Sequence, residues 1–285
     1  SWLRQEISPE FNDLIDVVHF HSLCAQLCRK AGIRFAPPER NSESFWKETA
    51  AYLMLDAIEQ NDERYKAIVV DEAQDFYPDW WEPLEILNED GEDGALYVFY
   101  DPAQNLYNEG NVSIPAMGKP YLLPTNCRNT KSISETCSEI LQRDIATHPQ
   151  APDGVSTEFL TEKKHKIPSV VDSLIKRMLT RDKIETSQIV ILSPNRFKHS
   201  CLNGLTKVGG QKLTMETSEW RQGEGILFST IRSFKGLEAD IVLLVDVVEP
   251  GSVDHFSSSD FYVACSRAKH VLKIISEQNI QDFLD

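Results

Sequence analysis

Basic side chains are scarce in this sequence, in which 29 lysines and arginines stand against 44 aspartates and glutamates. The formal net charge at pH 7 is −15. A protein that wraps nucleic acid over much of its surface is normally basic, because lysine and arginine must neutralise the phosphates. The composition therefore argues against a broad nucleic-acid surface, and any contact with nucleic acid would have to lie in a local groove.

Long apolar segments are also missing. No stretch reaches the roughly 18 apolar residues that a membrane-spanning helix needs, and residues 1–11 do not have the pattern of a targeting sequence. No low-complexity tract interrupts the chain, whose 285 residues can bury one large core or two of ordinary size. We therefore expect a soluble globular protein with no membrane partner.

The six cysteines include no CxxC pair and have no regular spacing. Reduced thiols in a cytoplasmic protein are the default interpretation. An alternative is a soft-metal site, or a metal or thiol enzyme, built on His19, His21, Cys24 and Cys28. That set fits zinc patterns only loosely, whereas the two cysteines share one face of a predicted helix, where free cysteine packs as a small hydrophobe. A buried helix stripe is therefore the favoured interpretation.

The stretch that organises the rest of the chain is residues 65–75, where an apolar run ends in an acidic cluster. Residues 65–70 (YKAIVV) are too few for a core helix and rich in β-branched side chains, so they predict a buried strand. In an open parallel sheet, ligands bind outside the carboxyl ends of the strands. Asp71 could there hold a magnesium ion while Glu72 activates a water, although an isolated pair of this kind is more often a solvated turn.

Strand and helix patterns alternate along the chain, which predicts an α/β fold with two lobes of mostly parallel sheet. Strands are expected at residues 14–20, 65–70, 95–100, 121–123, 157–160, 188–192, 225–229, 241–245 and 271–275. Helices are expected at residues 21–30, 44–60, 79–88, 130–143, 169–180, 196–205 and 257–268. Residues 110–120 read as a linker, so we place the domains at 1–118 and 119–285.

Further polar residues stand next to predicted strand ends. Gln104 follows the strand at residues 95–100, and Arg128 and Arg267 lie beside strands of the second lobe. Residues 230–238 (TIRSFKGLE) add more charge directly before the apolar run IVLLV. An arginine's planar fork suits phosphate oxygens, and a transferred phosphoryl group needs several such donors. Each residue alone is unremarkable, but together they form a constellation suited to nucleotide hydrolysis.

Five segments resemble motifs of a known family in order along the chain. They are IVVDEAQD, VFYDPAQNLY, LPTNCRNT, STIRSFKGLEADIV and FYVACSRAKHVL, which resemble motifs II to VI of the UvrD/Rep-like superfamily 1 DNA helicases. HFHSL, residues 19–23, looks like motif Ib of the same family. The SAT and HRxGR patterns of superfamily 2 are absent. The resemblance implies two RecA-like lobes, the first of them incomplete.

The resemblance also implies roles for individual residues in binding and hydrolysing ATP. Asp71 would hold Mg²⁺, and Glu72 would activate the attacking water. Gln104 would sense the γ-phosphate, while Arg128 and Arg267 would act like arginine fingers. The nucleotide would further be bound by Lys235, Gly236 and Glu238, with Glu238 on the ribose and Gly236 permitting close backbone approach. Single-stranded DNA, with RNA as another option, would be contacted by Phe20, His21, Ser22, Tyr107 and Arg232.

Several positions depart from the family pattern. Cys127 stands where the family has an aromatic that stacks on adenine, so base stacking is weakened or supplied elsewhere. Glu109 replaces a second aromatic of the nucleic-acid path, and Arg232 stands where motif V usually has histidine. The spans between motifs are too short for the large inserted subdomains of the best-known members. The chain therefore resembles compact members, such as the helicase part of proteins that also carry a nuclease-related domain.

The largest departure is the absence of any GxxxxGK[ST], the loop whose backbone and lysine hold the β- and γ-phosphates. In the family that loop lies upstream of motif Ib. We therefore expect the chain to be a C-terminal portion of a longer helicase, to need the missing N-terminal segment, and to be inactive alone. A first sheet without its central strand should leave apolar surface uncovered and make residues before about 120 the less stable part.

Two classes of function remain open at this point. The leading hypothesis is an ATP-dependent translocase or helicase on single-stranded nucleic acid, for which the resemblance suggests 3′-to-5′ movement on DNA. It also suggests a role in DNA repair, recombination or defence against foreign DNA. The rival is a non-catalytic module that binds nucleic acid or a partner protein and has dispensed with ATP.

Overall fold

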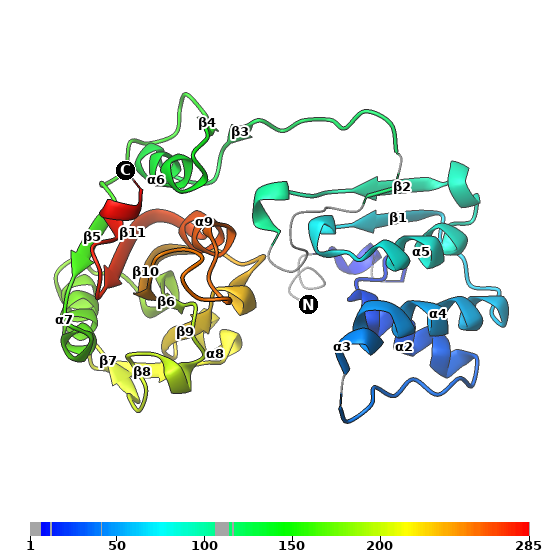
Figure 1. The fold of residues 1–285 in the computed structure, drawn as a ribbon, viewed down its shortest axis with the longest axis horizontal. Coiled ribbons are helices and arrows are strands. Elements are labelled where there is room, and N and C mark those ends of the chain that lie inside the picture. The colour runs from blue at the N-terminus through cyan, green and yellow to red at the C-terminus, as the bar shows by residue number, and fades with distance from the viewer. Residues whose placement is uncertain (1–6, 12, 41, 106–113, 116, 285) are drawn as a thin grey trace. The chain divides into compact units, whose positions relative to one another are not determined.

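The chain divides into two compact units, residues 1–119 and residues 120–285, in a computed structural model. The structure describes residues 7–11, 13–40, 42–105, 114–115 and 117–284 (Figure 1). The sequence placed the boundary after residue 118, and the compact units divide after Lys119. Each unit is an α/β assembly with its own core.

The first unit combines a helical layer with a small parallel sheet. Its helices are η1 (Pro9–Phe11), α2 (Phe20–Lys30), α3 (Ser42–Ser44), the π-helical η2 (Phe45–Thr49), α4 (Ala50–Glu59), η3 (Ala73–Asp75), η4 (Pro78–Trp80), α5 (Trp81–Leu87), η5 (Gly91–Asp93) and η6 (Pro102–Gln104). Its two strands are β1 (Ala67–Val70) and β2 (Ala95–Val98).

Helices α2 and α4 pack against each other through small apolar side chains. The Cys24 Sγ lies 3.4 Å from the Met54 Sδ, and the Cys28 thiol donates to the Leu53 carbonyl at 3.4 Å. Both cysteines are fully buried. The interpretation of this pair as a buried helix stripe is confirmed, and among the described residues no group of three or more His, Cys, Asp or Glu side chains is arranged to hold a metal ion.

The prediction of a strand at residues 14–20 is wrong. Residues 13–19 form a turn followed by irregular backbone, and α2 begins at Phe20. Leu14 is 78% exposed, and Ile15 and Val18 are exposed as well. An apolar run becomes a strand only when a neighbour supplies hydrogen-bond partners, and here its residues pair with no strand among the described residues.

Strands β1 and β2 are parallel neighbours, with Val70 opposite Val98 in the register. They are buried on one face only, because Val70 is 5% exposed whereas Val69 is 63% and Tyr97 57% exposed. Successive side chains of a strand point to opposite faces, so Val69 and Tyr97 belong to the uncovered one. The predicted strand at residues 65–70 is present as β1, but it is buried on one face only and leaves apolar side chains uncovered on the other.

The second unit is built around a seven-stranded sheet in the order β5-β11-β10-β6-β9-β8-β7. All neighbouring pairs are parallel except β7 with β8. These strands are β5 (Glu158–Thr161), β6 (Ile189–Ser193), β7 (Lys207–Val208), β8 (Gln211–Thr214), β9 (Ile226–Thr230), β10 (Ala239–Val247) and β11 (Ala268–Ser276). A separate pair consists of β3 (Thr125–Asn126) and β4 (Ala146–Thr147). The predicted α/β class with a mostly parallel sheet is confirmed.

Helices cover both faces of this sheet. The helices of the unit are α6 (Lys131–Leu141), η7 (Lys164–Lys166), α7 (Ile167–Thr180), η8 (Thr186–Gln188), η9 (Phe197–His199), α8 (Thr217–Arg221), η10 (Arg232–Phe234), α9 (Ser258–Ser266) and η11 (Ile280–Phe283). Val171 and Ile175 of α7 join a core cluster with Ile191 and Leu243. Residues of β10 whose side chains point to the opposite face of the sheet, such as Val242, are equally buried. Near that part of the sheet, α6 and α9 contact each other and β11.

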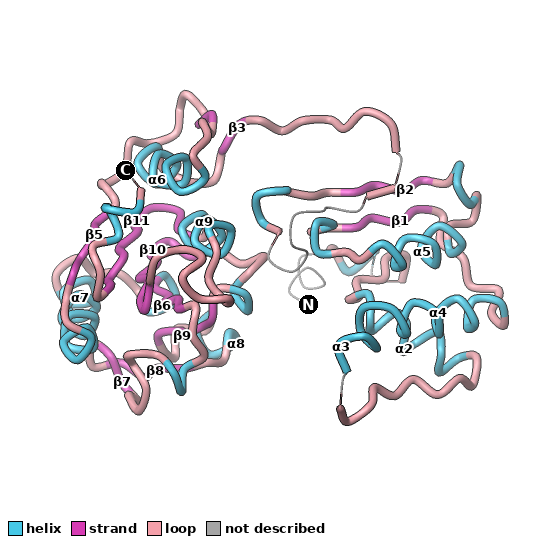
Figure 2. Tube along the Cα trace, viewed as in Figure 1, coloured by secondary structure: helices cyan, strands magenta, loops and turns pink. Residues whose placement is uncertain are grey.

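Two predicted elements of the second unit are absent from the structure. Residues 121–123 form no strand, and Figure 2 draws them as loop; Tyr121 is 91% exposed. Residues 196–205 are turns around η9 rather than a helix.

The antiparallel pair of β7 and β8 was missed. Its turn is Gly209-Gly210, with φ of 57° and 81°, and a Gly-Gly dipeptide between β-rich segments is a recognised hairpin signal. A Cβ on Gly209 would also lie 2.5 Å from the Ile175 side chain.

No helix among the described residues is both long and apolar enough to cross a membrane.

The one-sided burial of the small sheet gives a direct test. We expect Val70→Ala to lower the free energy of unfolding of the first unit by about 1–3 kcal/mol, because it leaves a cavity in the core. Val69→Ala should change it by less than about 0.5 kcal/mol, since that side chain is exposed. Urea unfolding read by tryptophan fluorescence reports on this unit through Trp46, Trp80 and Trp81 when Trp220 of the second unit is replaced by phenylalanine in every variant. Equal effects of the two substitutions would contradict the assigned faces.

Candidate functional site

The acidic pair Asp71-Glu72 directly follows the end of β1. The Glu72 N–H donates to the Asp71 Oδ1 at 3.0 Å, and Glu72 has a left-handed backbone with φ of 54° and ψ of 41°. That conformation is strained for a residue other than glycine, and such strain gathers at functional sites. Asp71 is exposed. Its carboxylate suits Mg²⁺, which is commonly held by one or two carboxylates together with waters and phosphates.

A buried glutamine links this pair to the end of β2. The Gln74 Nε2 donates to the Glu72 Oε2, and the Gln74 Oε1 accepts from the Asp101 N–H at 3.0 Å. The Asp101 carboxylate in turn accepts from the Gln104 Nε2 at 2.8 Å and from the Ala103 N–H at 2.9 Å. The structure therefore brings Glu72 and Gln104 into one hydrogen-bonded network at the carboxyl ends of two neighbouring strands.

Two residues predicted to contact nucleic acid belong to an aromatic cluster of the first unit. The Phe20 ring is stacked on Trp80, with centroids 4.3 Å apart and an interplanar angle of 8°. The His21 ring meets Trp80 and Trp46 edge-on, and its Nε2 lies 2.8 Å from the Trp46 carbonyl oxygen. In this structure both rings therefore pack against the protein's own tryptophans.

Ser22 is exposed and lines a shallow pocket of about 500 Å³ together with Gln26, Arg29 and Lys30 of the same helix. Tyr107 and Glu109 lie outside the described residues, so their predicted involvement stays a prediction.

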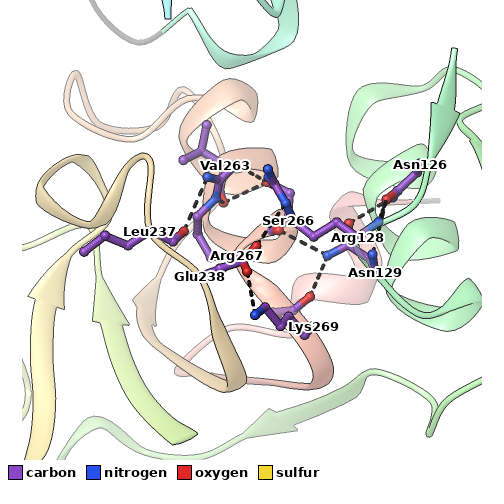
Figure 3. Close-up of polar contacts among 10 residues, drawn as sticks. Asn126, Arg128, Asn129, Leu237, Glu238, Val263, Ser266, Arg267 and Lys269 are labelled. Carbon is purple, nitrogen blue, oxygen red and sulfur yellow. Dashed lines mark hydrogen bonds and ion pairs between the residues drawn. The ribbon is translucent and has the colours of Figure 1, made fainter. Parts of the chain in front are cut away.

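In the second unit, Arg128, Glu238 and Lys269 form an ion-pair triad (Figure 3). The Arg128 Nε lies 3.2 Å from one Glu238 carboxylate oxygen, and the Lys269 Nζ lies 2.5 Å from the other. All three side chains are partly exposed. The predicted residues Arg128 and Glu238 are thus brought together, and Lys269 is a third member that the sequence did not suggest.

Asn126 and Asn129 hold the Arg128 segment in place. The Asn126 Oδ1 accepts from the backbone N–H groups of Arg128 and Asn129, at 2.9 Å and 3.2 Å. The buried Asn129 amide donates to the Ser266 and Ala268 carbonyls, at 3.1 Å and 2.5 Å. The loop before α6 is therefore fixed to the junction between α9 and β11, which Figure 3 shows.

Arg267 is buried and bonded to the protein itself. Its Nε donates to the Val263 carbonyl at 3.1 Å, its Nη1 to the Leu237 carbonyl at 3.5 Å and its Nη2 to the Ser266 Oγ at 3.1 Å. The Arg267 carbonyl accepts from the Ala239 N–H at 3.0 Å. Here the guanidinium ties α9 to the segment that carries Glu238, and its predicted contact with a phosphate stays a prediction.

The remaining predicted residues precede β10. The Arg232 Nε donates to the buried Asp260 carboxylate at 3.0 Å, and that carboxylate also caps α9 by accepting from the Ser257 N–H at 2.9 Å. Lys235 is half-buried. Gly236 has φ of 79° and open space where a Cβ would stand, which suits the close backbone approach that was predicted.

The cysteines differ sharply in environment. Burial raises the pKa of the Cys24 and Cys137 thiols to about 12. Burial, reinforced by the Asp246 carboxylate, raises the pKa of Cys201 to about 12 as well. Cys127, beside Arg128, is exposed.

Sequence reasoning missed the residues that position the site. Gln74, Asn129 and Asp260 are polar side chains that are buried in the fold. Hydrophobic periodicity predicts the burial of apolar residues only, so it gives no signal for these three. Gln74 and Lys269 lie inside the quoted motifs DEAQD and SRAKH, so their proximity to the predicted residues was an available signal.

The fold is similar to those of several solved helicase structures. No protein-family model matches the sequence, and no curated protein matches it. The chain is similar to the structure of the PRRSV helicase, with a TM-score of 0.44 and 14% identity over 80% of this chain and 39% of that one. It is similar to Arterivirus nonstructural protein 10 (helicase) in complex with DNA, with a TM-score of 0.44 and 16% identity over 79% and 43% of the chains.

A third similar structure is the C-terminal domain of a possible DNA helicase from Lactobacillus plantarum WCFS1. Its TM-score is 0.38, with 19% identity over 53% of this chain and 87% of that one. The chain therefore spans about two fifths of the length of the two viral helicases. At these identities and TM-scores, the similarity establishes neither a family nor an activity for this chain.

The anchoring role of Asn129 can be measured. Asn129→Ala removes the two buried hydrogen bonds to the Ser266 and Ala268 carbonyls and the one that the Asn129 Oδ1 accepts from the Asn126 Nδ2, so we expect the second unit to lose about 2–4 kcal/mol of stability. Hydrogen exchange of peptides from residues 120–285 would report the loss. The exposed Asn203 provides the control, since Asn203→Ala should leave exchange nearly unchanged. If both variants exchange alike, the assigned contacts are wrong.

Thiol reactivity gives a second test. At pH 8, iodoacetamide should alkylate Cys127 at least about 100-fold faster than Cys24 or Cys137, because the thiolate is the nucleophile and burial suppresses it. Peptide mass spectrometry of the native protein would measure each rate. A Cys127→Ser variant should show almost no rapid labelling, and rapid labelling of Cys137 instead would contradict the described packing.

Proposed function

We propose that this chain carries the ATP-hydrolysing and single-strand-contacting residues of an ATP-dependent translocase or helicase. The observation that carries the proposal is the network that joins Glu72 to Gln104 through Gln74 and Asp101. Strands β1 and β2 are parallel neighbours, so Glu72, which follows β1, and Gln104, which follows β2, lie at the same edge of the sheet. In a simple solvated turn, Glu72 would bond to water. Here the buried Gln74 bonds Glu72 and also the loop that carries Asp101.

Glu72, Gln104 and the neighbouring Asp71 have defined tasks in the proposed reaction. Glu72 accepts the proton of a water that attacks the γ-phosphorus, and the bond to the leaving ADP oxygen breaks with its electron pair going to ADP. Gln104 donates and accepts hydrogen bonds, so it can orient that water against the phosphate. Asp71 would hold Mg²⁺, which supplies charge neutralisation on the phosphate oxygens when bound.

The second unit carries a cation suited to phosphate. Arg128 has a fork of N–H donors suited to phosphate oxygens, and its Nε is paired with the partly exposed Glu238 carboxylate. A partly exposed ion pair is weak and can exchange partners. Arg128 can therefore leave Glu238 for a phosphate that carries more charge.

The partner in this proposal is single-stranded nucleic acid, DNA by the resemblance of the motifs. A chain with a net charge of −15 must bind it locally, and the exposed face of α2 with Ser22, Gln26 and Arg29 supplies polar and basic side chains for such a contact. Cycles of ATP binding and hydrolysis would drive movement along the strand.

A non-catalytic binding module is the second candidate. It is favoured by Arg267, whose guanidinium bonds to carbonyl oxygens of its own unit. In that case the acidic network would be a structural link between two loops.

ATP hydrolysis decides between the two candidates. The assay uses the chain with whatever flanking segments its gene encodes, beside the 285 residues alone, with and without single-stranded DNA. Glu72→Gln should lower the stimulated rate by about 10²–10⁴-fold, the usual contribution of a general base. Glu82→Gln, an exposed glutamate on α5, is the matched control and should retain the full rate. Undiminished hydrolysis by Glu72→Gln, or none by the unaltered protein, would favour the binding module.

A further inference from the structure

The second unit contains a pocket of about 430 Å³ that three segments of the chain enclose. Residues 127–130 form one wall, residues 148 and 150–152 a second, and Lys269 with His270 the third. Its volume lies within the range of small-molecule sites. The pocket lies entirely in this unit, so its walls are set by the contacts already described.

The charge of the pocket favours an anionic ligand. Arg128 and Lys269 both line it, and both are paired with the single carboxylate of Glu238. One carboxylate neutralises one of two cations, so a positive charge is left over at this point of a chain whose net charge is −15. Two cations spaced to grip opposite oxygens of one carboxylate are also spaced to grip oxygens of a phosphate chain.

The second wall supplies a flat ring. His148 is exposed and lines the pocket, and its Nδ1 accepts a hydrogen bond from the Gln150 N–H at 3.2 Å. The backbone N–H of His148 donates to the Asn126 carbonyl at 2.9 Å, and the backbone carbonyl of His148 accepts from the Ala151 N–H at 2.9 Å. The imidazole is therefore fixed on the same anchor that positions Arg128. Cys127, which offers no ring, lines the same pocket.

We propose that this pocket binds a nucleoside polyphosphate, with Lys269 on its phosphate oxygens beside Arg128 and with the His148 ring stacked on its base. The proposal rests on the proposed function and adds two ligand-binding residues to it. Glu238 holds the two cations apart until the phosphates replace its carboxylate. His148 supplies the stacking surface that Cys127 cannot.

Binding is measured in the Glu72→Gln background, so that hydrolysis does not interfere and binding can be scored even if the unaltered protein hydrolyses nothing. The probes are a fluorescent ATP analogue and inorganic tripolyphosphate, which has no base. Lys269→Ala should weaken both probes about tenfold, as expected for one charge-assisted hydrogen bond. His148→Ala should weaken the ATP analogue about five- to tenfold, as expected for loss of a stacked ring, and leave tripolyphosphate unchanged.

Two controls keep the result specific. Lys212→Ala breaks a comparable lysine–glutamate pair, with Glu219, on β8 and should leave both affinities unchanged. His148→Phe keeps a flat ring and should restore binding of the ATP analogue. ATP should also slow the alkylation of Cys127, because this residue lines the pocket. The labelling rate therefore measures ligand binding without an activity assay.

The proposal is overturned if Lys269→Ala and His148→Ala bind the ATP analogue like the parent, or if ATP leaves Cys127 labelling unchanged. It is equally overturned if a single-stranded oligonucleotide protects Cys127 and ATP does not, since the pocket would then bind the nucleic-acid backbone. Loss of hydrolysis in Glu72→Gln with unchanged binding in the pocket variants would leave the proposed function standing and remove this inference alone.

Discussion

The amide of Asn129 is the contact on which the second unit's site depends. It bonds to the Ser266 and Ala268 carbonyls on either side of Arg267, more than a hundred residues away in the chain. Because the next residue upstream is Arg128, this side chain, together with Asn126, fixes the backbone from which that guanidinium reaches Glu238. The position of a charged group on a loop depends on the backbone that carries it. Here the buried side-chain amide of Asn129 fixes that backbone.

The first unit uses the same device. Gln74 is fully buried and joins the Glu72 and Asp101 loops, as Asn129 joins the loops around Arg128 and Arg267. In both units a neutral amide, which can donate and accept at once, lies beside charged groups, of which Glu72, Asp101 and Arg128 stay partly exposed whereas Arg267 is buried. Burying an amide with its hydrogen bonds satisfied costs far less than burying a carboxylate, so Glu72 and Asp101 can stay near solvent, where a ligand can reach them.

The sequence predicted the α/β class, the strands at the centre of the large sheet, and the placement of Asp71, Glu72, Gln104 and Arg128 next to strand ends. Those predictions rest on long apolar runs and on the rule that polar groups collect where parallel strands end, and both are local signals. The strands expected at residues 14–20 and 121–123 fail because strand formation needs a partner, which local composition does not reveal. Gln74, Asn129 and Lys269 were missed because their roles come from contacts between segments far apart in the chain.

The uncovered face of the small sheet has a consequence for the protein in concentrated solution. Val69 and Tyr97 lie on a two-stranded sheet whose edges and apolar face would attract those of another copy. The excess of 15 negative charges acts against such encounters, because two copies repel each other before their apolar faces can meet. That repulsion reaches only about 8 Å at physiological ionic strength. The acidic composition therefore also serves colloidal stability, and added salt weakens this protection.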